Sequence, residues 1–574
     1  MARAPERTPN GVEQLLPYFL LVALTWVAHF LQFRQFGLYE DDYHYIGMYL
    51  DADFAAVRKI VASSLIDWPQ GRPLQSIVPP LLTTIAFPIG GLPLLYVMGF
   101  GVTAASAVLF YRLTLRVTGS PLTAVMGSVM FVLFPADTTH PFLMHAFVLR
   151  LAIVCALGAS LLYLNQRRSW AYLLAFTGLL LYETPLLIFL STPLLTVRWH
   201  ARRARRELLR HVFLCGTLMA FTVVMRVVNQ EARILDAQAS LIDILWTLPA
   251  QLLTGALTAI RQMTYGAVTR IGADLRTQLL VIMAIPLFYA WLRWASQRRS
   301  SPAPECYSPL PPLNAQDRTD RRLVGRLLLA SGAMLLIAYI LSFTHAAWII
   351  RGRLTSVHMA AAVGGSLLFA LVTYSVLVAL KHPILRQIAT GILAVHFAVL
   401  LGYRHSIQLD FARSWILQRW YWTNIVEAIG GHMTESTVVL IDGADMPRSR
   451  YIRTYSWFDP LVFEFLFHIP SGWRRPPAAL PLFNGTTHLE SREGVSSAFF
   501  AERPQWYPLL EGNVILVQQS DGRLLRSKAP SATLQGLQVS LRAPVNDPGT
   551  ELETRPLYNL LIDRGLLQRA GGAD

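Results

Sequence analysis

Cysteine is rare in this sequence, with three residues in 574. Cys155 and Cys215 fall inside apolar runs, and Cys306 lies in a proline-rich segment. So few cysteines exclude a disulfide framework. Charged residues are scarce as well, because they make up 15% of the chain whereas 53% of it is hydrophobic. This composition excludes an ordinary soluble globular protein and indicates a polytopic membrane protein.

Acidic residues are the scarcer of the two charges, with 35 Asp and Glu against 50 Lys and Arg. The basic excess falls in short segments between apolar runs, most densely at residues 198–210. This distribution follows the positive-inside rule, so it indicates membrane topology and no nucleic acid partner. The first apolar run lacks a small-residue cleavage site, which predicts an uncleaved anchor with a cytoplasmic N-terminus.

The apolar runs predict a mostly α transmembrane bundle with about eleven spans. Basic clusters placed on the cytoplasmic side give a consistent alternation of these spans. Residues 74–88 carry four prolines within or beside a short apolar run, so we expect a re-entrant or interfacial segment there. The expected spans are residues 14–33, 92–111, 122–134, 143–163, 170–182, 185–199, 212–228, 278–294, 327–343, 358–380 and 384–403.

Three parts are expected along the chain. Residues 1–403 form the membrane module, interrupted at 296–326 by a proline-rich, basic segment that we interpret as a flexible cytoplasmic linker. Residues 404–574 are expected to form a small α+β domain on the outer face, with a strand at 437–442, a helix near 460–468 and a hairpin of 514–518 with 524–526. The sequence lacks G-x-G-x-x-G and G-K-[ST], so the acids after the strand give no support for a nucleotide site.

The stretch F-G-L-Y-E-D-D-Y-H-Y-I, residues 36–46, holds three acids in a row directly after the first span. Carboxylates at a membrane edge are costly, which favours a function for Glu40, Asp41 and Asp42. The alternative is an acidic outer loop without chemistry. Residues 53–68 follow, with apolar side chains at helical spacing, and predict an amphipathic helix on the membrane surface beside the acids.

The motif D-D-x-x-Y, formed by Asp41, Asp42 and Tyr45, resembles the D-E-x-x-Y motif in the first outer loop of GT-C glycosyltransferases. That superfamily includes protein mannosyltransferases, aminoarabinose transferases and bacterial glucosyltransferases, and the G-R-P-L of residues 71–74 is similar to an element of the last group. The resemblance implies an inverting transfer of a sugar from a polyprenyl-phosphate donor to a glycan, lipid or protein acceptor. It also implies a multi-pass bacterial cytoplasmic membrane protein acting at the outer face of the cell envelope, with the C-terminal domain in the periplasm.

The resemblance implies that Asp41 is the catalytic base and that Asp42 assists it, although the family has Glu at the second position. A carboxylate within reach of the acceptor hydroxyl can accept its proton. Glu40 is expected to be dispensable. No cofactor is certain from the sequence, and a divalent cation, Mg²⁺ or Mn²⁺, held by Asp41 and Asp42 remains open.

A leaving phosphate needs cationic donors, and the outer-face candidates are Arg72, Arg351 and Arg353. For each arginine the alternative is a side chain that only reaches the lipid headgroups. The remaining candidates for substrate binding are His44, Tyr45, Asp137, His140 and Glu183. For these the alternatives are polar loop residues and, for Glu183, an acid beside a helix N-terminus.

Two other functions remain open from the sequence. A transporter or flippase of lipid-linked saccharides needs charged groups near the midplane, where the sequence offers Arg150 and Arg226. A non-catalytic assembly subunit needs only a C-terminal domain that binds a partner. Convergence of Asp41, the R-G-R pair and Asp137 favours the enzyme, because these residues lie far apart in the sequence.

Overall fold

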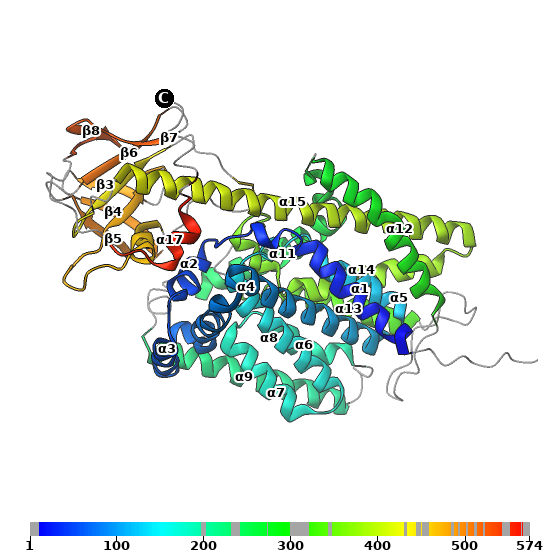
Figure 1. Cartoon of the computed structure of the whole chain (residues 1–574). Coiled ribbons are helices and arrows are strands. Elements are labelled where there is room, and N and C mark those ends of the chain that lie inside the picture. The colour runs from blue at the N-terminus through cyan, green and yellow to red at the C-terminus, as the bar shows by residue number, and fades with distance from the viewer. Residues whose placement is uncertain are drawn as a thin grey trace, which may run out of the picture.

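The protein forms a helical bundle with a small strand-containing domain at one end (Figure 1). The computed structural model describes residues 11–196, 202–230, 241–272, 274–298, 321–341, 347–429, 433–443, 449–450, 459–483, 487–491, 494–500, 503–509, 514–520, 523–541, 552–563 and 565. The expected mostly α class and a C-terminal region with strands are confirmed. We call the end of the bundle beside the C-terminal domain the domain end.

The bundle contains helices of very different lengths. Within the described residues, seven helical stretches are long and apolar enough to cross a membrane: Gln14–Gln35, Pro73–Thr118, His145–Leu164, Ala204–Val228, Leu275–Gln297, Ala361–Ala379 and Pro383–Ile429. The labelled helices are α1 (Gly11–His29), α4 (Pro73–Thr118), α5 (Pro121–Val132), α6 (Leu151–Leu164), α7 (Arg168–Leu181), α8 (Leu186–Leu190), α9 (Arg202–Val228), α11 (Leu241–Arg261), α12 (Leu275–Gln297), α13 (Arg321–Ile337), α14 (Ala361–Ala379) and α15 (Pro383–Ile429). These apolar helices support a membrane protein.

Several expected spans take another form. The run at 185–199 is divided into the five-residue α8 and a 3₁₀ helix, Thr192–Leu195, with Pro193 near its start. Between the expected spans at 212–228 and 278–294 lies the 21-residue helix α11. Residues 74–88 are helical and form the first part of α4, which breaks at Gly90 and Gly91. Most of the expected linker at 296–326 lies outside the described residues.

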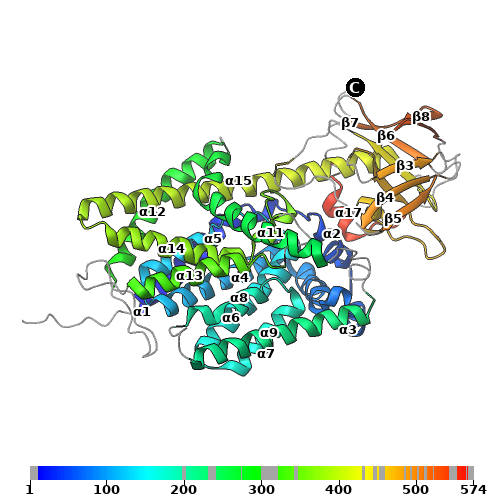
Figure 2. The same cartoon turned by 180° about the vertical axis from the view of Figure 1, so that it is seen from behind.

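Helix α15 joins the two parts of the molecule. Its 47 residues correspond to about 70 Å at 1.5 Å per residue. The helix leaves the bundle and reaches the C-terminal domain without interruption (Figures 1 and 2). The boundary expected at residue 403 therefore falls inside a helix, and the separate C-terminal fold begins after Ile429.

The C-terminal domain is built on a four-stranded sheet in the order β2-β1-β6-β7. Strand β1 (Val438–Asp442) pairs in parallel with β2 (Ala478–Pro481) and β6 (Val514–Ser520), and β7 (Arg523–Arg526) is antiparallel to β6. A second sheet and a hairpin follow, formed by β3 (Thr487–Ser491), β4 (Gly494–Phe500) and β5 (Arg503–Pro508), and by β8 (Ser531–Leu534) and β9 (Leu537–Ser540). The expected strand and hairpin pairing are confirmed, and α16 (Val462–Leu466) lies within the expected helix.

The acidic stretch lies at the domain end of the bundle. Its turn α2 (Asp41–Tyr45) lies near α3 (Phe54–Asp67), and α17 (Pro556–Leu561) of the C-terminal segment lies beside α2 in both views (Figures 1 and 2). The Asp53 carboxylate caps α3 by accepting from the Ala56 amide at 2.7 Å. Helix α3 packs against α4 and buries Val57 while Phe54 is exposed, so one face is turned outward.

Candidate functional site

The acidic stretch is fixed by close packing against α15. The Trp415 ring lies against Gly37, where an added Cβ would be 1.8 Å from ring atom Cδ2. The Tyr39 hydroxyl donates to the Phe411 carbonyl at 2.9 Å, and the Tyr96 hydroxyl of α4 donates to the Gly37 carbonyl at 2.6 Å. Only glycine fits at position 37, so this packing fixes the position of the segment that leads into the acids.

Asp41 forms an ion pair with Arg353. The arginine donates from Nη1 to both carboxylate oxygens, at 2.7 Å to Oδ1 and 2.9 Å to Oδ2. The two residues are 312 positions apart. The structure therefore brings together the expected catalytic acid and one arginine of the R-G-R pair.

Glu40 contributes to the same contact. Its Oε2 lies 3.4 Å from Arg353 Nε, and the residue is buried. Its backbone has φ +42° and ψ −104°, which is a strained conformation for a residue with a side chain. The expectation that Glu40 is dispensable therefore has no structural support, because Glu40 and Asp41 hold one guanidinium between them.

Asp42 has a different environment from Asp41. Its oxygens accept from the backbone amides of Met144 at 2.7 Å, Leu143 at 3.3 Å and Tyr39 at 3.2 Å. Burial raises the pKa of Asp42 to about 8, although these amide bonds favour the ionised form. The carboxyl group joins the acidic turn to residues 143 and 144, which lead into the helical turn His145–Arg150, so its geometry supports a structural role and not assistance in catalysis.

The R-G-R segment sends its two arginines in different directions. Gly352 has φ +80°, a region that favours glycine, and starts the 3₁₀ helix Arg353–His358. Arg353 contacts the acids, whereas Arg351 is exposed. Thr355 of this helix accepts from the Thr138 amide at 3.0 Å, which ties the segment to the Pro135–Pro141 turn. Of the two candidates, Arg353 is the one in the site.

A second charged group lies around Glu183. Arg72 forms an ion pair with Glu183 Oε1, and Arg226 at the end of α9 approaches the same oxygen at 3.5 Å. Arg72 also donates to Gln75 at 3.2 Å, and Gln75 donates to the Tyr45 hydroxyl at 3.0 Å. Burial raises the pKa of Glu183, but the two guanidiniums outweigh it and hold this pKa below its ordinary value.

Tyr182 connects the two charged groups. The Arg72 guanidinium lies 4.2 Å from the centroid of the Tyr182 ring. The charges of Arg353 and Asp41 also act on the Tyr182 hydroxyl. The structure thus gathers five residues expected from the sequence into one region, namely Asp41, Tyr45, Arg72, Glu183 and Arg353. Sequence reasoning missed Tyr182 as a site residue and considered Arg226 only as an intramembrane charge.

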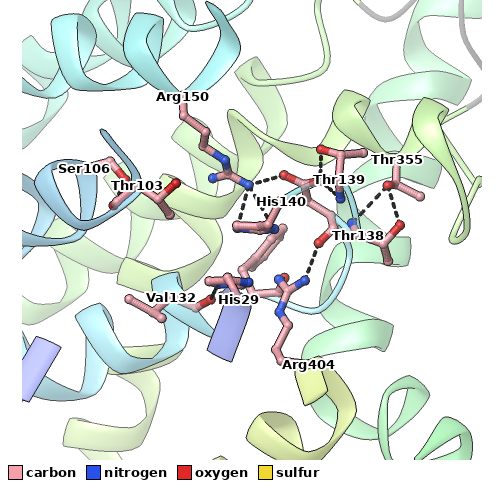
Figure 3. A network of polar contacts seen from close by, with 12 residues as sticks. His29, Thr103, Ser106, Val132, Thr138, Thr139, His140, Arg150, Thr355 and Arg404 are labelled. Atoms are coloured by element: carbon pink, nitrogen blue, oxygen red, sulfur yellow. Dashed lines mark hydrogen bonds and ion pairs between the residues drawn. The ribbon is translucent and has the colours of Figure 1, made fainter. Parts of the chain in front are cut away.

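Asp137 and His140 belong to a separate buried network (Figure 3). Arg150 forms an ion pair with Asp137 and lies 2.7 Å from His140 Nε2. The His140 ring stacks on His29 at 3.7 Å between centroids. Arg404 of α15 donates to the Asp137 carbonyl at 2.5 Å and to the Phe134 carbonyl. These contacts hold the 133–141 turn between α1, α6 and α15, which differs from the expected direct role in substrate binding.

Two further histidines lie next to the acids. Burial lowers the pKa of His44, an effect that the nearby Asp41 carboxylate partly opposes. His145 begins a π-helical turn, His145–Arg150, and the charges of Asp41 and Arg353 act on its ring.

A metal site at Asp41 and Asp42, which the sequence left open, does not fit the geometry. Both Asp41 oxygens face Arg353, and both Asp42 oxygens face backbone amides, so the two carboxylates do not share an open position. Among the residues that the structure describes, no group of three or more His, Cys, Asp or Glu side chains is placed to hold a metal ion. No step through a cation is therefore derived.

Comparison with known proteins gives no family for this chain. Neither a protein-family model nor a curated protein matches it. Any function must therefore be inferred from the site itself.

Proposed function

We propose that this protein is an inverting membrane glycosyltransferase that moves a sugar from a polyprenyl-phosphate donor to an acceptor hydroxyl. The observation that carries the proposal is the ion pair between Asp41 and Arg353, which brings a buried carboxylate and a cation into contact across 312 positions. A base for the acceptor and a cation for the leaving phosphate are the two groups that this reaction needs. The proposed setting is the outer face of a bacterial cytoplasmic membrane.

The reaction is a single displacement. The acceptor oxygen attacks the anomeric carbon of the sugar, and the bond between that carbon and the phosphate oxygen breaks. The hydroxyl proton passes to Asp41, and the polyprenyl phosphate leaves with the bonding electron pair. Arg353 stabilises the charge on the leaving phosphate through its planar fork of N–H donors.

The surroundings of the ion pair support this assignment. Arg72 and Arg226 add two cations near Glu183, and the charges of Arg72 and Arg353 both act on the Tyr182 hydroxyl. Helix α3 exposes Phe54, Leu65 and Ile66 beside this region. An apolar helix face next to a cationic region suits a substrate with a lipid tail and a phosphate headgroup.

The transporter alternative has one observation in its favour, the buried network of Asp137, His140, Arg150 and Arg404 (Figure 3). Charged groups inside a bundle often mark a transport path. In this network, however, Arg404 donates to two backbone carbonyls of one turn. That geometry suits a rigid scaffold better than a path with movable groups, so we favour the enzyme.

The proposal is tested with purified protein in lipid nanodiscs and a panel of polyprenyl-phosphate hexoses and pentoses. The measurement is release of polyprenyl phosphate in the presence of membrane extract as the source of acceptor. We expect Asp41→Asn to lose at least a hundredfold in rate, as removal of a general base does. The exposed Glu427→Gln variant, in α15, is the matched control. Full activity of Asp41→Asn, or movement of intact donor without release, would reject the assignment.

A further inference from the structure

The ion pair between Asp41 and Arg353 is unequal in its access to solvent. The Arg353 side chain is 35% exposed, whereas that of Asp41 is 12% exposed. A ligand that approaches the pair therefore meets the cation before the acid. The exposed part of the Arg353 guanidinium offers such a ligand a cation, which binds anionic groups such as phosphate.

The acid, for its part, is held by the cation. Both Asp41 oxygens accept from Nη1 of Arg353. In this contact the guanidinium covers the carboxylate oxygens that an acceptor hydroxyl would have to reach. In the state that the structure describes, Asp41 is thus bonded to Arg353 and does not face an acceptor hydroxyl.

We infer that a phosphate-bearing ligand displaces Asp41 from Arg353, and that this exchange is the event that makes Asp41 a competent base. The inference rests on the proposed function and adds an order to it, in which the donor binds before the acceptor loses its proton. An acceptor alone meets a carboxylate that Arg353 still occupies. The exchange transfers two hydrogen bonds of one guanidinium from a carboxylate to a phosphate and forms or breaks no covalent bond.

The geometry around Arg353 suits such an exchange. A guanidinium binds carboxylate and phosphate oxygens with the same fork of donors, so one can replace the other. Glu40 Oε2 lies 3.4 Å from Nε, on another nitrogen than the one that Asp41 occupies. Glu40 can therefore keep the side chain in place while Nη1 changes partner, which gives the strained backbone of Glu40 a purpose.

The test measures the affinity of the full-length protein for polyprenyl monophosphate in phosphatidylcholine nanodiscs, by titration of intrinsic fluorescence. We expect Asp41→Asn to bind this lipid about tenfold more tightly than the wild type, because a competing partner of Arg353 is gone. Arg353→Gln is expected to bind at least tenfold more weakly. Exposed residues of α15 supply matched controls, Glu427→Gln and Arg413→Gln, which are expected to match the wild type.

Two further titrations distinguish which kind of phosphate the site binds. Inorganic phosphate is added in the buffer, and phosphatidylglycerol replaces polyprenyl monophosphate in the nanodisc. If Asp41→Asn raises the affinity for polyprenyl monophosphate alone, the site recognises both the phosphate headgroup and the polyprenyl tail. An equal response to inorganic phosphate assigns the site to the anion alone, and an equal response to phosphatidylglycerol assigns it to lipid phosphate in general.

A measurement on the wild type covers the case in which a variant does not fold. Carbodiimide labelling of Asp41, measured by mass spectrometry, should increase when polyprenyl monophosphate is added, because the displaced carboxyl group is no longer covered by the guanidinium. Unchanged labelling, or an Asp41→Asn variant that binds the lipid no more tightly, overturns the exchange. Loss of transfer in that same variant would leave the proposed function standing, so the two failures are distinguishable.

Discussion

Arg555 donates to both carboxylate oxygens of Asp51, from Nε at 2.8 Å and from Nη2 at 2.6 Å, across 504 positions of the chain. The same guanidinium donates to the carbonyl oxygens of Met48 at 3.0 Å and Glu464 at 2.8 Å. Residues 552–563 are thereby fastened to the loop that carries the acids. The C-terminal segment is a structural component of the candidate site's surroundings.

Arg555→Gln should loosen this attachment. The change removes a bidentate ion pair and two carbonyl contacts, for which we expect a loss of about 2 kcal/mol in the free energy of unfolding. Hydrogen exchange of the amides in residues 47–53 should accelerate, and Arg58→Gln serves as the control at an exposed arginine. Unchanged exchange in those amides would show that the segment is held by other contacts.

Asp42 should make the stability of the protein depend on pH. Its pKa is raised on folding, from its ordinary value near 4 to about 8, so the folded state binds this proton more tightly than the unfolded state. The stability that Asp42 contributes through this proton is therefore complete below pH 4 and is lost as the pH rises through 8. The free energy of unfolding falls over this range by at most about 1.4 kcal/mol per pH unit. Thermal unfolding in detergent between pH 5 and 9 measures the slope, which Asp42→Asn should remove. An equal slope in the variant would assign the effect to another group.

Gly37→Ala should displace the acidic stretch. The added methyl group would lie 1.8 Å from the Trp415 ring, so either the loop or the ring must move. We expect a loss of about 3 kcal/mol or more in stability, together with loss of the proposed transfer. The double variant Gly37→Ala with Trp415→Ala should recover part of both, because it removes the clash. No recovery would mean that the glycine is required for another reason.

Arg404→Met should weaken the scaffold and leave the chemistry of the site intact. The fully buried guanidinium donates to the carbonyls of Asp137 and Phe134, which the variant leaves without these donors. Two such losses correspond to about 3 kcal/mol in unfolding free energy. Thermal unfolding measures it, and the apparent KM for the donor lipid should stay near the wild-type value. A large rise in KM with normal stability would place Arg404 in substrate binding.

The site residues that could be predicted are charged side chains at an expected membrane edge, where charge is costly and therefore indicates a function. Asp41, Arg72 and Arg353 were expected from their charge and position, and the structure places them in one region. The bond from Asp42 to the amides of residues 143 and 144 was not predictable, because spacing in the sequence does not show which backbone groups meet a side chain. Arg226 was missed as a site residue for the same reason, since only folding brings the end of α9 to Glu183.

The fold was predictable where apolar length decides it. Long apolar runs became helices, whereas the run at 185–199 carries Pro185 and Pro193 and is divided. The helix α15 passes residue 403 because Arg404, His405 and Gln408 find buried polar partners and remain helical, although their polarity indicated the end of a span. Polarity alone marks a membrane boundary only where such residues have no partner inside the protein.

The long sequence separations in the site also govern its biosynthesis. Asp41 emerges early from the ribosome, yet its partner Arg353 follows 312 residues later, and Asp51 waits 504 residues for Arg555. At about 5–20 residues per second, this interval is tens of seconds. During that time the acids of the first loop stand in the growing chain without the arginines that neutralise them. A nascent chain that stops before residue 353 carries Asp41 without Arg353, and one that stops before residue 555 carries Asp51 without Arg555, so the acidic loop reaches its final contacts only after the C-terminal segment is made.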